Sequence, residues 1–257
     1  MALFTPRCPV DDRERTWITE NIEWLRDVFG DEPLSAPVIL PTSEYFPPPF
    51  SGSDQDIRSA ASRAAGYMGV QTDVDIEVSD KIDHIRALQR IIPAGTTRSA
   101  GAAGTYASGP EGGRPVITID RSAVSDPVRL VAVIAHELGH VRLLSEGWLP
   151  AGRKDGEPLT DLATVYLRMG IFTANAAFSF SRLPADGNQR TSGWRAQRLG
   201  YMTEPMLGFA LACHAMLRAE PDPPWARYLD TNPRVYMKHG IRYLRHTMSR
   251  RPGGQPR

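Results

Sequence analysis

The chain has 257 residues, of which 41% are hydrophobic, and its 30 basic residues almost balance its 29 acidic ones. This length allows a sizeable core in one large domain or two packed lobes, and the balanced charge excludes a strongly basic nucleic-acid or membrane-surface binder. Its two cysteines, Cys8 and Cys213, lie far apart and form no disulfide framework, and neither a membrane-spanning run nor a signal-peptide core is visible. We expect a soluble, cytoplasmic protein with no nucleic-acid or membrane partner.

The first fifty residues are predicted to form a helix and a strap that packs on the rest of the chain. Apolar residues repeat at helical spacing over residues 16–29, and Gly30 follows as a terminator. Residues 31–50 contain six prolines interleaved with aromatic side chains. This mixture favours an ordered strap over a free linker, with a polyproline site for a partner as the alternative.

The main domain is predicted to span residues 51–249. Its elements, in chain order, are a helix over 53 to 66 or 68, a strand over 74–78, a loop or hairpin over 95–115, a strand over Val116–Asp120, a helix carrying residues 131–140, a helix over 158–172, a polar loop over 181–200, and helices over 203–219 and 232–248. The loop with four arginines could be a lid over a cleft or a solvated connection. Residues 250–257 are predicted to be a disordered tail.

Residues 131–140 carry the sequence His-Glu-x-x-His within an apolar run. Asp126 suits an N-cap and Pro127 a first helical position, so the motif is predicted to lie on a buried helix that ends near Gly147.

His136 and His140 are four residues apart and therefore project from one helix face, where two imidazoles can hold one Zn²⁺. Glu137 follows the first histidine and can take a proton from the water on the metal.

A third ligand is expected on the next helix, which Pro158 begins. Glu157 could complete a His-His-Glu site with its fourth position open, while Asp161, one turn on, could accept a hydrogen bond from a ligand imidazole. Because Pro158 puts Glu157 at the edge of its helix, the reverse assignment of the two acids stays open.

The pattern His136-Glu137-x-x-His140 followed by Glu157-x-x-x-Asp161 resembles the gluzincin, or thermolysin-like, branch of zinc metallopeptidases over roughly residues 117–172. It is also similar to a group of uncharacterised bacterial proteins with the same motif. The resemblance implies an α+β, zincin-like fold, with a small mixed or antiparallel sheet packed on the zinc helix and a mostly helical C-terminal lobe. It further implies peptide substrates bound along an edge strand, which would be Val116–Asp120 or a strand near Thr105 and Tyr106.

Two further roles follow from family resemblance. Gluzincins often stabilise the oxyanion with a Tyr or His from the downstream helical region, where Tyr201 is the first choice and His214 and Tyr166 the others. The segment around Cys8, Pro-Arg-Cys-Pro-Val-Asp, is similar to the cysteine switch of matrix metalloproteinase propeptides, in which a thiolate blocks the zinc. A small apolar side chain that anchors the N-terminus is the other interpretation of Cys8.

The sequence therefore predicts a cytoplasmic zinc peptidase with one Zn²⁺ per chain and a peptide or protein substrate. The alternative is a zinc-bearing regulatory or binding protein whose site is occluded and catalytically silent. A purely structural zinc fits less well, because structural sites usually recruit cysteines and fill all four positions.

Overall fold

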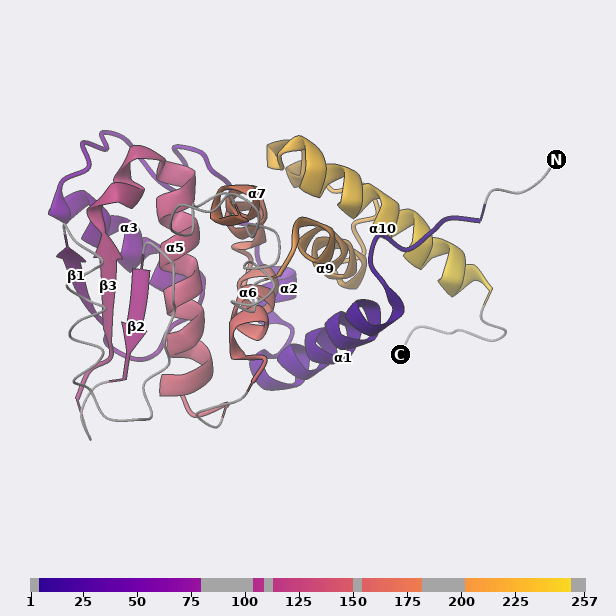
Figure 1. Ribbon diagram of the computed structural model, residues 1–257, viewed down its shortest axis with the longest axis horizontal. Helices are drawn as coiled ribbons and strands as arrows, with labels where there is room; N and C mark the ends of the chain where they lie inside the picture. Colours follow the sequence, from indigo (N-terminus) through magenta and orange to yellow (C-terminus); the bar gives the residue numbers. More distant parts are fainter. Residues whose placement is uncertain (1–4, 80–103, 109–112, 150–153, 182–201, 251–257) are drawn as a thin grey trace, which may run out of the picture.

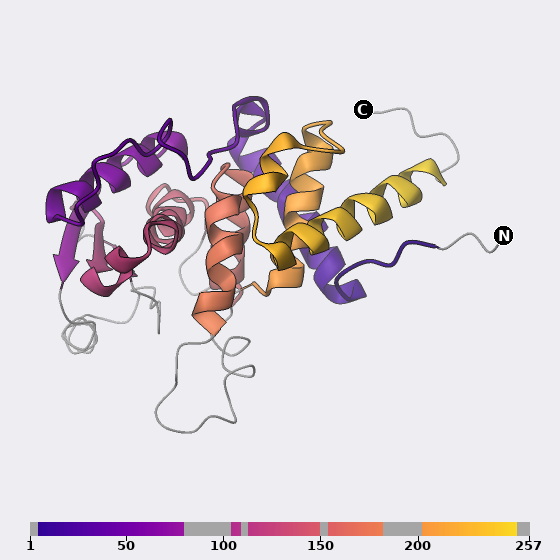
Figure 2. The ribbon, with the colours of Figure 1, turned by 90° about the horizontal axis from the view of Figure 1, so that it is seen from above.

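The computed structural model describes residues 5–79, 104–108, 113–149, 154–181 and 202–250, with the side chains of 178–181 left out. A small sheet lies at one end of the molecule, and helices fill the rest (Figure 1). Seen from above, the helices of residues 156–181 lie between the sheet side and the C-terminal helices (Figure 2). The predicted α+β class, with a small mixed sheet and mostly helical content, is confirmed, while the zincin-like topology stays a prediction.

The described sheet has three strands in the order β1-β3-β2. Strand β1 (Asp75–Ser79) pairs in parallel with β3 (Val116–Asp120), and β2 (Gly104–Ala107) pairs antiparallel with the other side of β3. The prediction of β3 as the edge strand is wrong, because it is paired on both sides. Its inward side chains Ile117 and Ile119 are fully buried, as a central strand requires. The alternative strand near Thr105, β2, lies at the edge of the described sheet.

Helix α5 (Pro127–His140) carries the His-Glu-x-x-His motif beside β2 and β3. Its beginning matches the prediction, since the Asp126 carboxylate accepts hydrogen bonds from two backbone N–H groups of the first turn, and Pro127 needs no such partner. Every residue from Leu130 to His140 is buried. The helix continues as a wider π-turn, η2 (Val141–Ser145), before Gly147 turns the chain with a φ of 80°.

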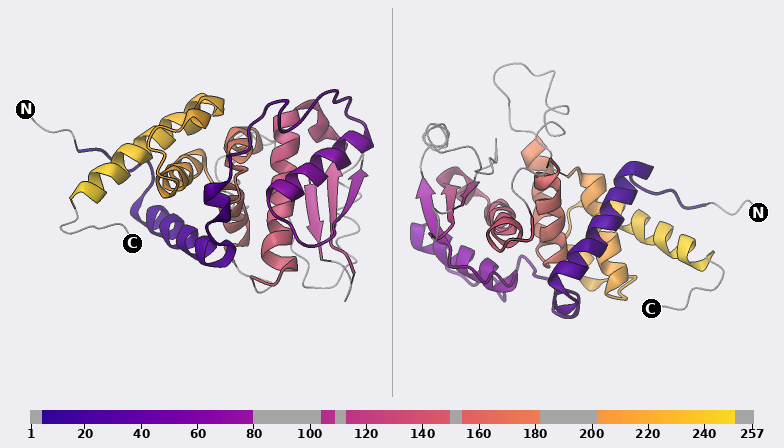
Figure 3. Two further views of the ribbon diagram at one scale, coloured as in Figure 1. Left: turned by 180° about the vertical axis from the view of Figure 1, so that it is seen from behind. Right: turned by 90° about the horizontal axis from the view of Figure 1, so that it is seen from below.

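The remaining elements are mostly helical. Their bounds are α1 (Asp12–Phe29), α2 (Glu32–Ser35), α3 (Asp54–Tyr67), η1 (Arg121–Ser125), α6 (Gly156–Tyr166), α7 (Gly170–Ser181), α9 (Glu204–Leu217), η3 (Pro224–Tyr228) and α10 (Thr231–Ser249). Helix α3 lies across the sheet when the molecule is seen from behind, and α1 crosses the α9–α10 pair when it is seen from below (Figure 3). Among these described helices, none combines the length and the apolar character needed to cross a membrane.

Helix α1 begins four residues earlier than predicted. The Asp11 carboxylate accepts a hydrogen bond from the Glu14 N–H at 2.9 Å, and the Glu14 carboxylate accepts one from the Asp11 N–H at 3.1 Å. This reciprocal capping box stabilises a helix start among polar residues, where the apolar periodicity gives no signal.

The single helix predicted over 158–172 is instead two helices. Helix α6 ends at Tyr166, and Arg168 adopts a left-handed φ of 75° before α7 begins. The strap and the end of α3 hold this break. The Ile39 N–H donates to the Arg168 carbonyl at 3.1 Å, and the Arg168 guanidinium donates to the carbonyls of Pro37 in the strap and Tyr67 in α3. Phe46 of the strap also packs edge-on against the Phe172 ring at 5.5 Å. The proline-rich segment is thus ordered against α3 and α7.

Candidate metal centre

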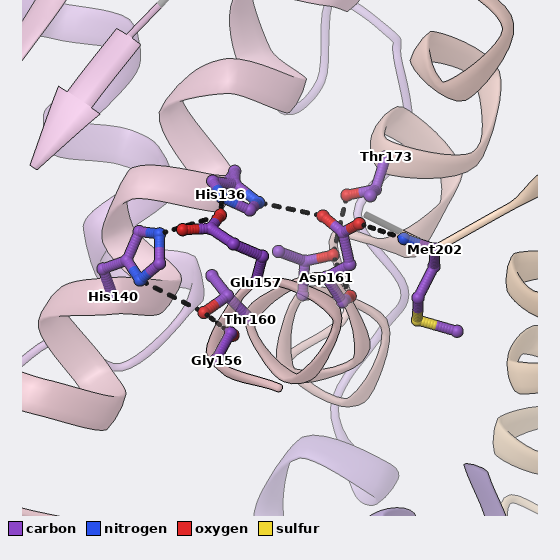
Figure 4. A network of polar contacts seen from close by, with 9 residues as sticks. His136, His140, Gly156, Glu157, Thr160, Asp161, Thr173 and Met202 are labelled. Atoms are coloured by element: carbon purple, nitrogen blue, oxygen red, sulfur yellow. Dashed lines mark hydrogen bonds and ion pairs between the residues drawn. The ribbon is translucent and has the colours of Figure 1, made fainter. Parts of the chain in front are cut away.

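Three predicted ligands meet where α5 faces the first turn of α6 (Figure 4). Glu157 Oε2 lies 3.0 Å from His136 Nε2 and 3.6 Å from His140 Nε2. One ligand atom from each of the three residues lies within 4.8 Å of the others, so the group can hold a metal ion. Local structure accounts for the geometry: the helical spacing of four aligns the histidines, and Glu157 enters from the start of the neighbouring helix.

The spacing of these donor atoms suits a small tetrahedral ion. Ligands about 2.0–2.1 Å from a Zn²⁺ are separated from each other by about 3.3 Å in a tetrahedral site. The two measured separations from Glu157 Oε2, 3.0 and 3.6 Å, lie on either side of that value. His140 Nε2 is buried without a hydrogen-bond partner in the described part of the chain. A buried lone pair without a partner is costly, and a metal ion would satisfy it.

Both imidazoles are turned so that Nε2 faces Glu157. His136 Nδ1 lies 2.8 Å from Asp161 Oδ1, and a carboxylate there accepts the Nδ1 hydrogen. His140 Nδ1 lies 3.2 Å from Thr160 Oγ1, whose own hydroxyl donates to the Gly156 carbonyl at 2.8 Å. The Thr160 oxygen is therefore left to accept from His140. These bonds put hydrogens on Nδ1 and leave Nε2 as the ligand atom of each histidine.

The electrostatics of the cluster favour a positive charge between the carboxylates. Burial alone would lower the pKa of His136, but its hydrogen bonds to Asp161 and Glu157 outweigh burial and raise that pKa well above its usual value. Burial likewise opposes ionisation of Glu157, yet the two histidines lower its pKa to about 2. A cation is therefore stabilised here, and metal binding would displace a proton from the cluster.

Glu137 is fully buried, and neither of its carboxylate oxygens has a hydrogen-bond partner among the described residues. Burial raises its pKa, although the neighbouring histidines act in the opposite direction. Strand β2 passes directly beside it: a Cβ added at Gly104 would lie 3.2 Å from Glu137 Oε1. The same Cβ would lie only 2.6 Å from Val133 Cγ1, so the absence of a side chain at Gly104 lets β2 pack this closely on α5.

The structure separates the two downstream acids. Glu157 faces the Nε2 atoms of both histidines, whereas Asp161 stands on the Nδ1 side of His136. Asp161 Oδ2 also accepts a hydrogen bond from the Met202 N–H at 3.0 Å, so this carboxylate joins the centre to the start of α9.

Tyr106 of β2 is a residue of the centre that the sequence reasoning did not identify. Its ring stacks on His140 with centroids 5.7 Å apart and an interplanar angle of 29°, and its hydroxyl lies 2.8 Å from Ser145 Oγ. The sequence carries no spacing signal for this contact, because it arises from the packing of β2 beside α5.

The three residues predicted as possible oxyanion donors differ in what the structure shows of their positions. Tyr201 lies outside the described residues. The Tyr166 hydroxyl donates to the Gly30 carbonyl at 2.6 Å, at the end of α1. His214 is buried on α9 beside the Trp225 ring, and burial lowers its pKa to about 3. Tyr166 and His214 are thus parts of the packing between helices.

The cysteine-switch interpretation of Cys8 is wrong. Cys8 is half-buried near the start of α1, where its charged neighbours include Arg15 and Asp12, and burial raises the pKa of its thiol. The chain before α1 lies beside α10, at the end of the molecule opposite α5 (Figure 1). The anchoring interpretation agrees with its packing against the core. The predicted arginine-containing loop and C-terminal tail fall outside the described residues, save for the first residue of each.

No protein-family model, curated protein or solved structure matches this chain.

Proposed function

We propose that the chain is a zinc-dependent hydrolase of peptide or amide bonds. The observation that carries the proposal is the position of Glu137, a buried carboxylate without hydrogen-bond partners in the described structure, directly beside a His-His-Glu donor set. Two imidazoles, one carboxylate and an open position are the ligand set of catalytic zinc in metallopeptidases. A zinc ion held there would polarise a carbonyl and lower the pKa of a water molecule to about 7.

Glu137 is suited to move the proton. Its raised pKa and the absence of hydrogen bonds from the described residues leave the carboxylate able to accept a proton from water and deliver it to a leaving amine. Asp161 contrasts with it, because both of its oxygens already accept hydrogen bonds, from His136 and from Met202. The two acids are therefore assigned different tasks, proton transfer for Glu137 and orientation of a ligand for Asp161.

The substrate is proposed to lie along β2. This strand is at the edge of the described sheet, and Gly104 puts its backbone beside the Glu137 carboxylate. An extended peptide can add to such an edge by main-chain hydrogen bonds, which would bring its own backbone close to the base. We propose a peptide or protein substrate on this basis.

One observation favours the alternative of a silent, regulatory zinc protein. Glu137 has no exposed surface and His140 is 1% exposed, while the Glu157 side chain is 17% exposed, so most of the centre is covered. A site that stays covered would keep its zinc without admitting a substrate.

The distinguishing experiment combines metal content with peptide cleavage. Zinc would be measured by mass spectrometry in the wild type, His136→Ala and Glu137→Gln, and cleavage of a mixed peptide library would be followed for each. We expect about one zinc per chain in the wild type and in Glu137→Gln, loss of zinc in His136→Ala, and cleavage by the wild type alone. The hydrolase proposal would be refuted if the wild type and Glu137→Gln both bind zinc and cleave peptides equally, or if neither cleaves any peptide. Lack of zinc in the wild type would remove the metal centre as well.

A further inference from the structure

The two histidines of the centre are held unequally. His136 Nδ1 is hydrogen-bonded to the charged carboxylate of Asp161 at 2.8 Å, whereas His140 Nδ1 has the neutral Thr160 hydroxyl at 3.2 Å. Hydrogen bonds to an ionised group are shorter and roughly twice as strong as neutral ones. His140 therefore depends more than His136 on other contacts for its orientation.

The ring of Tyr106 supplies such a contact. A histidine ring turns easily about χ2, because that torsion has no sharp staggered minima. One hydrogen bond fixes the direction of Nδ1 but leaves the ring plane less restrained. Tyr106 covers the face of the His140 imidazole at a centroid distance of 5.7 Å and a tilt of 29°, which opposes rotation of that plane.

Tyr106 is itself held at both ends. Its backbone lies in β2 opposite the fully buried Ile117 of the central strand. Its hydroxyl lies 2.8 Å from Ser145 Oγ in η2, immediately after α5. The tyrosine side chain thus joins the sheet to the end of the helix that carries the ligand.

The π-turn explains how Ser145 reaches this position. Residues five apart on a regular α-helix point about 140° away from each other. The π-turn spans Val141–Ser145 and has more residues per turn, so it brings Ser145 round toward the side of His140. The irregular end of α5 therefore serves the contact with Tyr106.

We propose that Tyr106 is a positioning residue for the metal ligand His140. The aromatic face fixes the plane of the imidazole, and β2 thereby sets the direction of Nε2. The Tyr106 hydroxyl lies 2.8 Å from Ser145 Oγ, and its ring stacks on His140, so the proposed role is exerted through His140. This inference rests on the proposed metal centre, but it does not require that the centre hydrolyse anything.

The test compares three variants by metal binding. Tyr106→Leu removes the aromatic face, Tyr106→Phe removes only the hydroxyl, and Tyr166→Leu removes an equally buried tyrosine whose hydroxyl bonds to Gly30. Zinc affinity would be measured by competition with a chromophoric chelator, and ligand geometry by the visible absorption of the Co²⁺-substituted protein. We expect about tenfold weaker binding and an altered Co²⁺ spectrum for Tyr106→Leu, as for loss of other groups that orient ligands. Tyr106→Phe should stay within about twofold of the wild type, and Tyr166→Leu should keep the wild-type spectrum.

A wild-type affinity and spectrum in folded Tyr106→Leu would overturn the proposal, and so would equal losses in Tyr106→Leu and Tyr106→Phe. If circular dichroism shows that Tyr106→Leu does not fold, Tyr106→Met replaces it, because methionine fills the volume without an aromatic face. A wild type that binds no zinc would remove this proposal together with the metal centre. A wild type that binds zinc but cleaves no peptide would remove the hydrolase alone.

Discussion

Replacing Glu137 with glutamine should make the metal-free protein more stable at neutral pH. The carboxylate is fully buried, and the described residues give neither of its oxygens a hydrogen bond. Its raised pKa means that the folded chain holds the proton more tightly than the unfolded chain does. Above the unfolded pKa, ionisation of Glu137 therefore opposes folding, and an amide that cannot ionise removes that opposition.

The size of the effect follows from the cost of burial. A buried polar group without a partner costs about 1–3 kcal/mol, and a charged one costs more. Glutamine has nearly the shape of glutamate and still leaves polar atoms unsatisfied, so the gain is only the part due to charge, about 1–2 kcal/mol. His136 and His140 offset some of the cost, but burial prevails, because the net shift of the Glu137 pKa is upward. For a chain of this size the melting temperature should rise by roughly 2–4 °C per kcal/mol.

The assay is chemical denaturation followed by circular dichroism, with EDTA and then with saturating zinc. The gain should be larger in EDTA, since a bound cation would itself stabilise the carboxylate. Glu146→Gln is the matched control and should lower the stability, because Glu146 forms an ion pair with Arg142 and accepts a hydrogen bond from the Gln71 N–H at 3.0 Å. A Glu137→Gln protein no more stable than the wild type in EDTA, beside a destabilised Glu146→Gln, would refute the reasoning.

Three further outcomes are expected. Asp161→Ala should lower the zinc affinity about 10–100-fold, and Glu157→Ala should lower it further, as measured by competition with a chelator. The reverse order would make Asp161 the ligand and Glu157 the residue that orients it. Gly104→Ala should keep its zinc but lose most peptide cleavage, because the new Cβ crowds the Glu137 carboxylate. Adding Val133→Ala removes the 2.6 Å clash with Val133 Cγ1 but leaves the crowding of Glu137. Cleavage restored in that double variant would show that Val133, and not Glu137, was the cause of the loss. Zinc at about 100 times its Kd should stabilise the wild type by about 2.7 kcal/mol, and a thermal-shift assay should show no such gain for His136→Ala.

Local signals predicted α5, its start and the helical alignment of its histidines. Asp126 and Pro127 determine where the helix begins through contacts within one turn, and the spacing of four fixes which side the imidazoles share. Strand β3 was predicted with its observed bounds for a similar reason, since alternation is a property of the strand itself. Its place in the centre of the sheet was missed, because pairing depends on which other strands approach.

The contacts that were missed depend on distant parts of the chain. The break at Arg168 is held by carbonyls of Pro37 and Tyr67 and by the Ile39 N–H, so an apolar pattern that continues through it predicts one helix where two exist. Tyr106 reaches His140 only because β2 lies beside α5, a relation that no spacing in the sequence expresses. Cys8 shows the converse, since a short local likeness suggested a role that its position excludes.

The ability of the centre to hold a metal ion depends more on the contact between α5 and α6 than on the His-Glu-x-x-His motif alone. Gly139 stands between the ligand positions of α5, and a Cβ there would come within 2.8 Å of Thr160 Cγ2. Without that side chain, α6 can approach closely enough for Glu157, Thr160 and Asp161 to reach the histidines. Thr160 and Asp161 follow Glu157 by three and four positions, so the three residues share one face of α6, and each meets a different atom of the imidazoles. A His-Glu-x-x-His helix packed against another face would keep its two histidines and lose the third ligand and both hydrogen bonds that orient them.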